Sequence, residues 1–169
     1  MPTRDWREWC IHDEAQIAGF KGPFEFLCNF YPCINHVMCF DGNFVMPDVE
    51  HAYQFAKLEP NEQSAALSQH VFRLSAGDAK KWGQTIPKRR DWDEIKTTVM
   101  QHCVFSKFLR HKELRDRLVA TGSRRLVERN WWKDTFWGTN LRGEGTNVLG
   151  HILMDTRDYW RSSVYGRES

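Results

Sequence analysis

The chain has 169 residues, of which 41% are hydrophobic and 27% are charged, a composition that excludes a disordered tail and suffices for a buried core. Two ordinary domains would need a longer chain, so we expect one domain over residues 1–169. Its 24 Lys and Arg residues exceed its 22 Asp and Glu residues by only two, so the net charge gives no general reason to expect binding to nucleic acid or to a membrane.

The N-terminal residues Met1–Trp6 lack the apolar core of a secretion signal. No stretch approaches the roughly eighteen apolar residues that a membrane span needs. The five cysteines are an odd number, which favours free thiols in a reducing compartment over a disulfide framework. We therefore expect a cytoplasmic protein without a membrane partner.

Extended segments and then a helix are predicted in the first third of the chain. The extended segments, of which the last two flank an Asp-Gly hairpin loop, cover residues 24–30, 37–40 and 44–46. After Pro47, Asp48 is a favourable N-cap. Apolar residues then recur at helical spacing, so we expect a helix that runs to Lys57.

Two later helix starts are marked by a capping residue with an acidic residue three positions on, namely Ser75 with Asp78 and Asp91 with Glu94. The remaining predicted elements are helices over 92–109, 111–121 (closed by Gly122) and 146–160, and a short strand over 125–128. In the last helix, we expect Val148, Leu149, Ile152 and Leu153 to face inward. The fold class is therefore α+β, a mainly helical domain with a small sheet.

Glu50, Gln54 and Lys57 form a polar row on an otherwise apolar helix, because residues four and seven positions apart return to one face. A carboxylate, an amide and an amine in one row are suited to acid–base chemistry. The spacing alone favours a more ordinary interpretation, in which Glu50 and Lys57 lie on the solvent side of an amphipathic helix.

A second candidate site is the aromatic-rich segment 131–140, with Asp134 at its centre and Gly138 directly after Trp137. Some of the eight tryptophans could form flat walls for a base or sugar. A carboxylate among indole rings has a raised pKa or needs a hydrogen-bond donor. The alternative is an Asp that bonds its own backbone in a turn.

Two segments are possible phosphate contacts. Residues 143–150 form a Gly-rich entry into the last helix, where backbone N–H groups can receive a phosphate. This segment matches neither a Walker A loop nor a dinucleotide fingerprint, so a simple capped loop is the alternative. The basic stretches Lys80–Lys81 and Lys88–Arg90 are the second possibility, and a solvated face is their alternative.

A metal site is considered because Cys28, Cys33, His36 and Cys39 lie within twelve residues. Their spacing lacks the paired Cys-x2-Cys knuckles of the common zinc folds. We expect buried free thiols, a loop histidine and no metal.

Several motifs occur in order between Gly22 and Trp160: Phe26-Leu27-Cys28-Asn29-Phe30-Tyr31-Pro32, Val49-Glu50-His51 with Lys57, Arg90-Asp91-Trp92, Asp134 with Trp137-Gly138, and Asn147 with Leu149-Gly150 and Arg157. Together they resemble the YbiA-like or NADAR family over nearly the whole chain. The chain has Cys28 and Asp48 where the family usually has Ser. Asp48 is an equivalent N-cap. Cys28 lacks the strong hydrogen bond of a serine hydroxyl, so the resemblance does not fix the substrate subclass of this chain.

The resemblance implies a YbiA-like fold and an N-glycosidase activity, on ribosylaminopyrimidine intermediates of riboflavin synthesis or on ADP-ribose attached to guanine. Both substrates contain a bond between ribose C1 and an exocyclic amine. The resemblance also makes Glu50 and Asp134 the catalytic carboxylates, and we expect Glu50 to handle the proton. Lys57 offers a covalent variant, since a glycosylamine can open to an imine and exchange with a lysine as a Schiff base.

Substrate contacts are expected around this centre, with no cofactor. Asn29 and Phe30 are expected at the sugar, Trp92 and Trp137 at the base, and the loop Asn147–Gly150 with Arg90 or Arg157 at a phosphate; His51, Gln54 and Gly138 complete the predicted set. Trp and Phe at these positions are equally suited to a core. The expected partner is a nucleotide-like molecule, ADP-ribose or a ribosylaminopyrimidine phosphate, or an ADP-ribosylated nucleic acid.

Two other functions fit the same residues. One is a non-catalytic module that binds NAD or ADP-ribose, which gains little from two carboxylates, Glu50 and Asp134, facing a phosphorylated ligand. The other is an antitoxin or phage-defence partner that acts by protein contact. Such a partner would still neutralise its toxin after Glu50→Ala, whereas an enzyme would not.

Overall fold

The computed structural model describes residues 5–165, and its contacts divide the chain into two compact units. We call residues 29–112 the central unit, and residues 1–28 together with 113–169 the terminal unit. The first four residues of the N-terminal segment considered above lie outside the described part. The single domain over residues 1–169 stays a prediction. Within residues 5–165, no helix combines the length and apolar character that crossing a membrane requires.

The central unit opens with the predicted hairpin, formed by the antiparallel strands β3 (Val37–Met38) and β4 (Val45–Met46). The Cys39 N–H donates to the Phe44 carbonyl at the mouth of the loop. Gly42 has a φ of +77°, a conformation that suits glycine in such a turn. The sequence prediction of an Asp-Gly hairpin is therefore confirmed.

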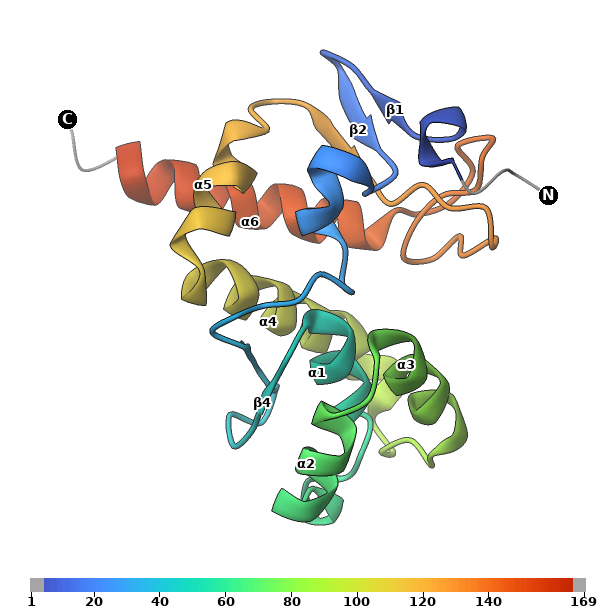
Figure 1. Cartoon of the computed structure of the whole chain (residues 1–169), viewed down its shortest axis with the longest axis vertical. Coiled ribbons are helices and arrows are strands. Elements are labelled where there is room, and N and C mark those ends of the chain that lie inside the picture. The colour runs from blue at the N-terminus through green and yellow to red at the C-terminus, as the bar shows by residue number, and fades with distance from the viewer. Residues whose placement is uncertain (1–4, 166–169) are drawn as a thin grey trace. The chain divides into compact units, whose positions relative to one another are not determined.

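Helix α1 (Val49–Phe55) follows, and Asp48 caps it by accepting the N–H of His51. The helix ends two residues before Lys57, which lies in the turn beyond it, so the predicted helix was slightly too long. Every residue of α1 is buried, because the helix packs against α3 and α4 (Figure 1). A short helix with no exposed face is stabilised by packing against its neighbours and not by intrinsic helix propensity.

The other helices of the central unit are η3 (Pro60–Glu62), α2 (Ala65–Phe72), α3 (Ala76–Thr85) and α4 (Trp92–Arg110). Helix α3 begins as predicted, with the Ser75 hydroxyl accepting the N–H of Asp78. Helix α4 has nearly the predicted span but not the predicted capping box, since the Asp91 carboxylate is held by Arg89 over 2.7 Å instead. Helix α2 has no counterpart among the predicted elements.

The terminal unit contains a three-stranded sheet in the order β1 (Ile11–His12), β2 (Gln16–Ala18), β5 (Arg125–Val127). Strand β2 pairs antiparallel with β1 and parallel with β5. The prediction of β5 is confirmed. Strands β1 and β2 are too short to show an alternating pattern, and they were not predicted.

Helix α5 (Lys112–Ala120), apart from its first residue, and helix α6 (Val148–Tyr165) complete the terminal unit with the short 3-10 helix Trp6–Glu8. Helix α6 packs against β5 (Figure 1) and buries Leu149, Ile152 and Leu153 as predicted, whereas Val148 is only half-buried. It begins two residues later than predicted because Asn147 has a φ of +52°, which is not helical.

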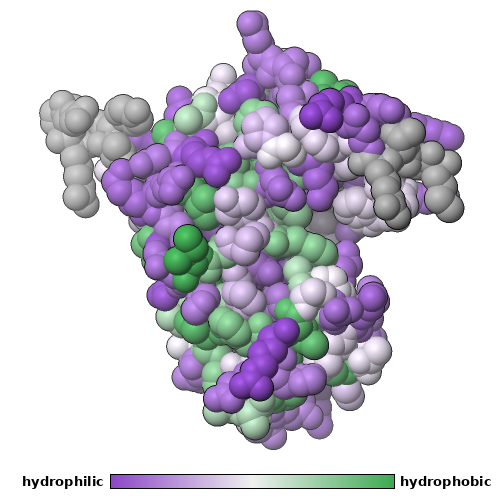
Figure 2. All heavy atoms as spheres, viewed as in Figure 1, coloured by the Kyte–Doolittle hydropathy of each residue, from purple (hydrophilic) through white to green (hydrophobic). Residues whose placement is uncertain are grey.

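One predicted element is wrong. Residues Gly22–Leu27 form a 3-10 helix where extended chain was expected over 24–30. Pro23 in the first turn favours helical backbone, and the adjacent side chains of Phe26 and Leu27 are both buried, which an extended strand with one buried face does not allow. The predicted α+β class, mainly helical with small sheets, is confirmed. On the face in Figure 2, hydrophobic residues reach the surface in separate groups among hydrophilic ones.

Candidate active site

Glu50 lies on α1 and is only 6% exposed, so the surface-helix interpretation is wrong. Its backbone N–H donates to the Asn29 carbonyl over 3.1 Å, and its Oε1 accepts from Gln54 Nε2 over 2.7 Å. Burial raises the pKa of Glu50, against the opposing effects of the Gln54 hydrogen bond and of nearby lysine charges. A carboxyl group of this kind holds its proton to higher pH, as a general acid must.

Lys57 is buried just beyond α1, and its Nζ donates to the Gly83 carbonyl over 2.8 Å. The same Nζ lies 5.9 Å from the ring centres of both Tyr53 and Trp92. Burial lowers the pKa of Lys57 to about 8, although the charge of Glu50 opposes the shift. A neutral amine is therefore accessible near neutral pH, and this is the nucleophilic form.

Gln54 lies beside Glu50 on α1 as the polar row predicted, whereas Lys57 joins them from the turn beyond the helix. The Gln54 Nε2 is used by Glu50, whereas its Oε1 is buried and has no hydrogen-bond partner within residues 5–165. A buried acceptor without a partner is costly. The N–H of a bound substrate would remove that cost, so Gln54 is the strongest of the predicted substrate contacts.

Gly83 makes room for this amide, because a Cβ at position 83 would overlap Gln54 Oε1. We expect Gly83→Ala to lower turnover about 10- to 100-fold, since displacing Gln54 removes the donor that holds Glu50, and to lower the melting temperature through overpacking. Turnover and thermal unfolding test both effects.

The matched control is Gly77→Ala on the same helix, where the nearest atom to a new Cβ is Ser75 Oγ at 3.9 Å. It should keep wild-type turnover and gain up to about 1 kcal/mol of stability from helix propensity. Wild-type turnover in Gly83→Ala would show that the packing of Gln54 does not matter.

His51 has structural partners at both ring nitrogens. Nδ1 lies 2.8 Å from Asp48 Oδ1, and Nε2 lies 3.1 Å from the Leu74 carbonyl. Burial opposes a charged ring, but the Asp48 hydrogen bond and charge raise the pKa of His51. Two acceptors require a doubly protonated ring, which leaves no ring nitrogen for the predicted substrate contact.

The other predicted residues of the central unit differ in exposure. Asn29 contacts the row directly, because its carbonyl accepts the backbone N–H of Glu50. The neighbouring Phe30 has its ring centre 5.9 Å from the Nζ of Lys80. Trp92 is buried and packs on Tyr53, so it belongs to the core and does not form an open wall. Arg90 has an exposed side chain, and its phosphate contact stays a prediction.

Asp134 lies in the terminal unit, and its side chain caps a turn. Its Oδ1 accepts the backbone N–H of Phe136 over 3.2 Å and of Trp137 over 2.9 Å, while Asn130 bonds its backbone. This arrangement is the turn interpretation that the sequence left open. Glu50 and Asp134 belong to different units, and their pairing as catalytic carboxylates stays a prediction.

The loop before α6 does not offer free amides to a phosphate. The N–H groups of residues 146–149 donate to the carbonyls of residues 135–138. The Asn147 side chain bonds the backbone of Leu126 and Glu128, and a Cβ at Gly150 would overlap the Leu126 carbonyl. At Gly138, a Cβ would overlap the Glu128 carbonyl. Asn147, Gly138 and Gly150 therefore shape the backbone, and these contacts argue against the predicted phosphate site.

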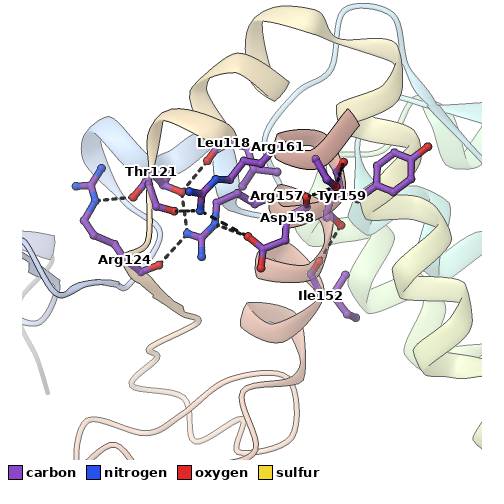
Figure 3. A network of polar contacts seen from close by, with 11 residues as sticks. Leu118, Thr121, Arg124, Ile152, Arg157, Asp158, Tyr159 and Arg161 are labelled. Atoms are coloured by element: carbon purple, nitrogen blue, oxygen red, sulfur yellow. Dashed lines mark hydrogen bonds and ion pairs between the residues drawn. The ribbon is translucent and has the colours of Figure 1, made fainter. Parts of the chain in front are cut away.

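Arg157 on α6 is buried and structural (Figure 3). Its Nη1 donates to Thr121 Oγ1 over 3.0 Å and to the Arg124 carbonyl over 2.8 Å. These bonds fasten α6 to the segment between α5 and β5. Nη1 is thus used within the fold, and the buried Nε makes no hydrogen bond to the described residues but lies 3.7 Å from Asp158 Oδ1. These contacts argue against the predicted phosphate contact.

Three aromatic side chains of the segment 131–137 are exposed: Trp131 (51%), Trp132 (45%) and Phe136 (41%). Trp137 is half-buried and packs edge-on against Phe136, with ring centres 4.9 Å apart. Exposed rings therefore gather in this segment beyond Trp137 alone, and their role as walls for a base stays a prediction.

The cysteines are free thiols, and three of them, Cys33, Cys39 and Cys103, are buried. Burial raises the pKa of Cys39 to about 12, so this thiol stays protonated. No set of three or more His, Cys, Asp or Glu side chains within residues 5–165 is arranged to hold a metal ion.

Sequence reasoning missed Gly83 at this site and did not single out Lys80. Gly83 is one glycine inside a predicted helix, and only its contact with Gln54 marks it. Lys80 was seen as part of a basic stretch, but nothing in that stretch distinguishes it from Lys81.

Comparison with known proteins places the chain in a family. The NADAR domain model matches residues 18–161. An N-glycosidase of Nostoc punctiforme is 34% identical over 142 residues, which cover 83% of this chain and 88% of that protein. N-glycosidase YbiA of Escherichia coli is 40% identical over 116 residues, 66% of this chain and 69% of that protein.

A riboflavin biosynthesis protein of Vibrio vulnificus is 38% identical over 138 residues, 79% of this chain but only 35% of that longer protein. The NMR structure of Escherichia coli YbiA matches with a TM-score of 0.71 at 28% identity, over 98% of this chain and 96% of that one. The predicted YbiA-like fold is thereby confirmed. Because the family model spans most of the chain, this protein belongs to the NADAR domain family, as the sequence resemblance predicted.

Proposed function

We propose that this chain hydrolyses the bond between ribose C1 and the exocyclic amine of a ribosylated guanine-type base, with Glu50 as the proton-handling group. The observation that carries the proposal is the buried cluster of Glu50, Gln54 and Lys57, in which burial shifts the pKa of the carboxyl up and that of the amine down. Opposed shifts of this kind are typical of acid–base sites.

The general reaction class rests on the family. Relatives from Nostoc and Escherichia are N-glycosidases, and relatives from Vibrio and maize are riboflavin biosynthesis proteins. The chain is accordingly an N-glycosidase, a hydrolase that acts on N-glycosyl compounds. The finer choice, a ribosylaminopyrimidine or an ADP-ribosylated guanine, belongs to the proposal, since the chain spans only 35% of the Vibrio protein and 20% of the maize protein.

In the proposed reaction, the bond from C1 to the amine breaks and water supplies the new oxygen at C1. Protonated Glu50 gives its proton to the leaving amine, and the carboxylate so formed takes a proton from the attacking water, which restores the starting state. Gln54 Nε2 holds the carboxyl group throughout. Asp134 would supply negative charge to the developing positive charge at C1.

Incubation of the wild-type protein with ADP-ribosylated guanine DNA and, separately, with the phosphorylated riboflavin intermediate tests the proposal. We expect release of ADP-ribose or of ribose phosphate from at least one of them. Asp134→Asn keeps the Oδ1 acceptor of the turn and removes only the negative charge. A loss of product release in this variant would therefore show that the charge of Asp134 takes part in the reaction. No release from either substrate by wild type would remove the proposed function, and binding without release would identify a non-catalytic module.

The exposed rings of Trp131 and Trp132 favour the nucleic-acid form of the substrate, because bases stack on aromatic side chains. We expect the double variant Trp131→Ala, Trp132→Ala to lower kcat/KM on ADP-ribosylated single-stranded DNA about 10- to 100-fold, and to leave an ADP-ribosylated mononucleotide unaffected. Ile34→Ala, at an exposed position of the central unit, is the control. Equal losses on both substrates would contradict stacking on the strand.

A further inference from the structure

We infer that Lys80, assisted by Lys88, binds the phosphate at the 5′ end of the substrate ribose and so selects phosphorylated glycosylamines over unphosphorylated ones. This inference rests on the proposed N-glycosidase function and adds to it a specificity-determining residue. The shared ligand chemistry is a ribose 5′-phosphoryl group, present as a monoester in ribosylaminopyrimidine phosphates and as a diphosphate in ADP-ribose.

Lys80 lies on α3, the helix that packs against α1 and its Glu50. Its Nζ lies 5.9 Å from the ring centre of Phe30. Phe30 directly follows Asn29, whose carbonyl accepts the backbone N–H of Glu50. The charge of Lys80 acts on Glu50 more strongly than that of Lys57, and it also acts on Lys57. An aromatic face attracts an ammonium group, so Phe30 helps to keep Lys80 beside the reaction centre.

Lys88 approaches the same cluster from the segment after α3. The N–H of its neighbour Arg89 donates to the Lys57 carbonyl over 2.7 Å, which places this segment against the turn that carries Lys57. The charge of Lys88 also lowers the pKa of Lys57. Lys88 has an exposed acidic neighbour as well, Asp93, but that carboxylate is already paired with Lys96 over 3.1 Å.

Two neighbouring cations of these segments, Lys81 and Arg89, are neutralised by carboxylates, whereas Lys80 is not. Lys81 pairs with Asp78 over 3.2 Å. Arg89 pairs with Asp91 over 2.7 Å and lies 3.7 Å from Asp41.

In the part of the chain that the structure describes, no carboxylate lies within ion-pair distance of Lys80. The charges of Lys80 and Lys57 act on Glu50, and the charge of Lys88 acts on Lys57, whereas the second carboxylate beside Glu50, Asp48, is already paired with His51 over 2.8 Å. A bound phosphate would balance this surplus positive charge.

The alternative phosphate contacts in the terminal unit are already used by the fold. The backbone amides at the start of α6 donate to the carbonyls of residues 135–138. Arg157 Nη1 is bonded to Thr121 and Arg124, and its Nε lies 3.7 Å from the carboxylate of Asp158. Lys80 has no such competing partner, which makes it the better candidate for phosphate.

The test compares a ribosylaminopyrimidine 5′-phosphate with the dephosphorylated nucleoside for wild type, Lys80→Met and Lys81→Met. We expect Lys80→Met to lower kcat/KM about 10- to 100-fold on the phosphorylated substrate only, mainly through KM, as for the loss of one charged hydrogen bond. Lys88→Met should show a smaller loss of the same kind. The control Lys81→Met removes an exposed lysine of the same helix and should change neither substrate.

Equal losses on both substrates in Lys80→Met would mean that Lys80 acts only through Glu50 and Lys57, and the inference would be wrong. Unchanged kinetics on the phosphorylated substrate would place the phosphate elsewhere and would also overturn it.

Failure of the proposed function is distinguishable, because wild type would then turn over neither of these substrates and would also release no ADP-ribose from ADP-ribosylated guanine. A titration of the protein with ribose 5-phosphate and, separately, with ADP-ribose locates the phosphate site without turnover, since ¹⁵N chemical shifts report which residues are affected. Comparison of the two ligands shows whether the site binds the monoester or the diphosphate. Saturable shifts in α3 that are lost in Lys80→Met but kept in Lys81→Met support the inference. Absent shifts, or equal shifts in both variants, overturn it.

Discussion

We expect Glu50→Gln to lower kcat by about 10²- to 10⁴-fold, the range typical for removal of a general acid–base group. Glutamine has the shape of glutamate, and its Oε1 can still accept from Gln54 Nε2, so the helix and its hydrogen bonds should be retained. Single-turnover release of the ribosyl product measures the effect on chemistry separately from product release. Glu94→Gln, an exposed carboxylate of α4 in the same unit, is the control and should keep wild-type turnover.

The same substitution should improve stability at neutral and higher pH. Burial raises the Glu50 pKa above its ordinary value of 4.5, so the folded protein holds this proton more tightly than the unfolded chain. Its contribution to stability is complete below pH 4.5 and is lost as the pH rises through the folded pKa. Glu50→Gln does not titrate, so its free energy of unfolding, relative to wild type, should be higher at pH 8 than at pH 4. Urea unfolding at both pH values measures this difference.

Near-wild-type turnover in Glu50→Gln would remove Glu50 from the mechanism.

The second large effect is expected for Lys57→Met, which should lower turnover on the order of 10²-fold, as for loss of an acid–base or nucleophilic group. In the covalent variant, the ribosyl ring opens to an imine, and the Lys57 amine adds to C1 and expels the base amine. Water then hydrolyses the lysine imine and releases the ribose as its aldehyde, which closes to the ring. Borohydride reduces the lysine imine to a stable adduct, so mass spectrometry should find it in wild type and not in Lys57→Met.

The pH profile gives an independent readout of Lys57. Because burial lowers its pKa from 10.5 to about 8, the neutral amine forms as the pH rises through about 8 and not only above 10. We expect an ascending limb of kcat/KM near pH 8 in wild type that Lys57→Met lacks. Lys81→Met, at an exposed lysine, is the control. If Lys57→Met keeps near-full turnover and wild type yields no adduct, the covalent route is wrong.

Local chemistry determined most of the helix starts and the hairpin. Asp48 and Ser75 act as N-caps because their side chains reach the N–H three residues on, and this depends only on neighbours in sequence. The Asp-Gly hairpin and the span of α4 were predictable for the same reason. The prediction failed where a second local side chain competed for the cap, because Arg89, two residues away, binds the Asp91 carboxylate. It also failed where strands were too short to show a period.

The order of motifs along the chain determined the family, and it pointed to Glu50 before any contact was known. Spacing alone could not show that Glu50, Gln54 and Lys57 are buried, because an amphipathic helix and a fully enclosed one can have the same polar row. Only the packing of α1 against α3 and α4 decides this, and with it the direction of both pKa shifts.

Tertiary structure also distinguished residues that look equivalent in sequence. Lys80 and Lys81 are neighbours, yet one acts on Glu50 while the other pairs with Asp78 at the surface. The amides of residues 146–149 resemble a phosphate site until the carbonyls of 135–138 are seen to occupy them. The sequence by itself thus determined most of the helices, the hairpin and the family, and it singled out Glu50 as a candidate. Burial, charge balance and the occupancy of each donor were decided by long-range contacts, which no local pattern encodes.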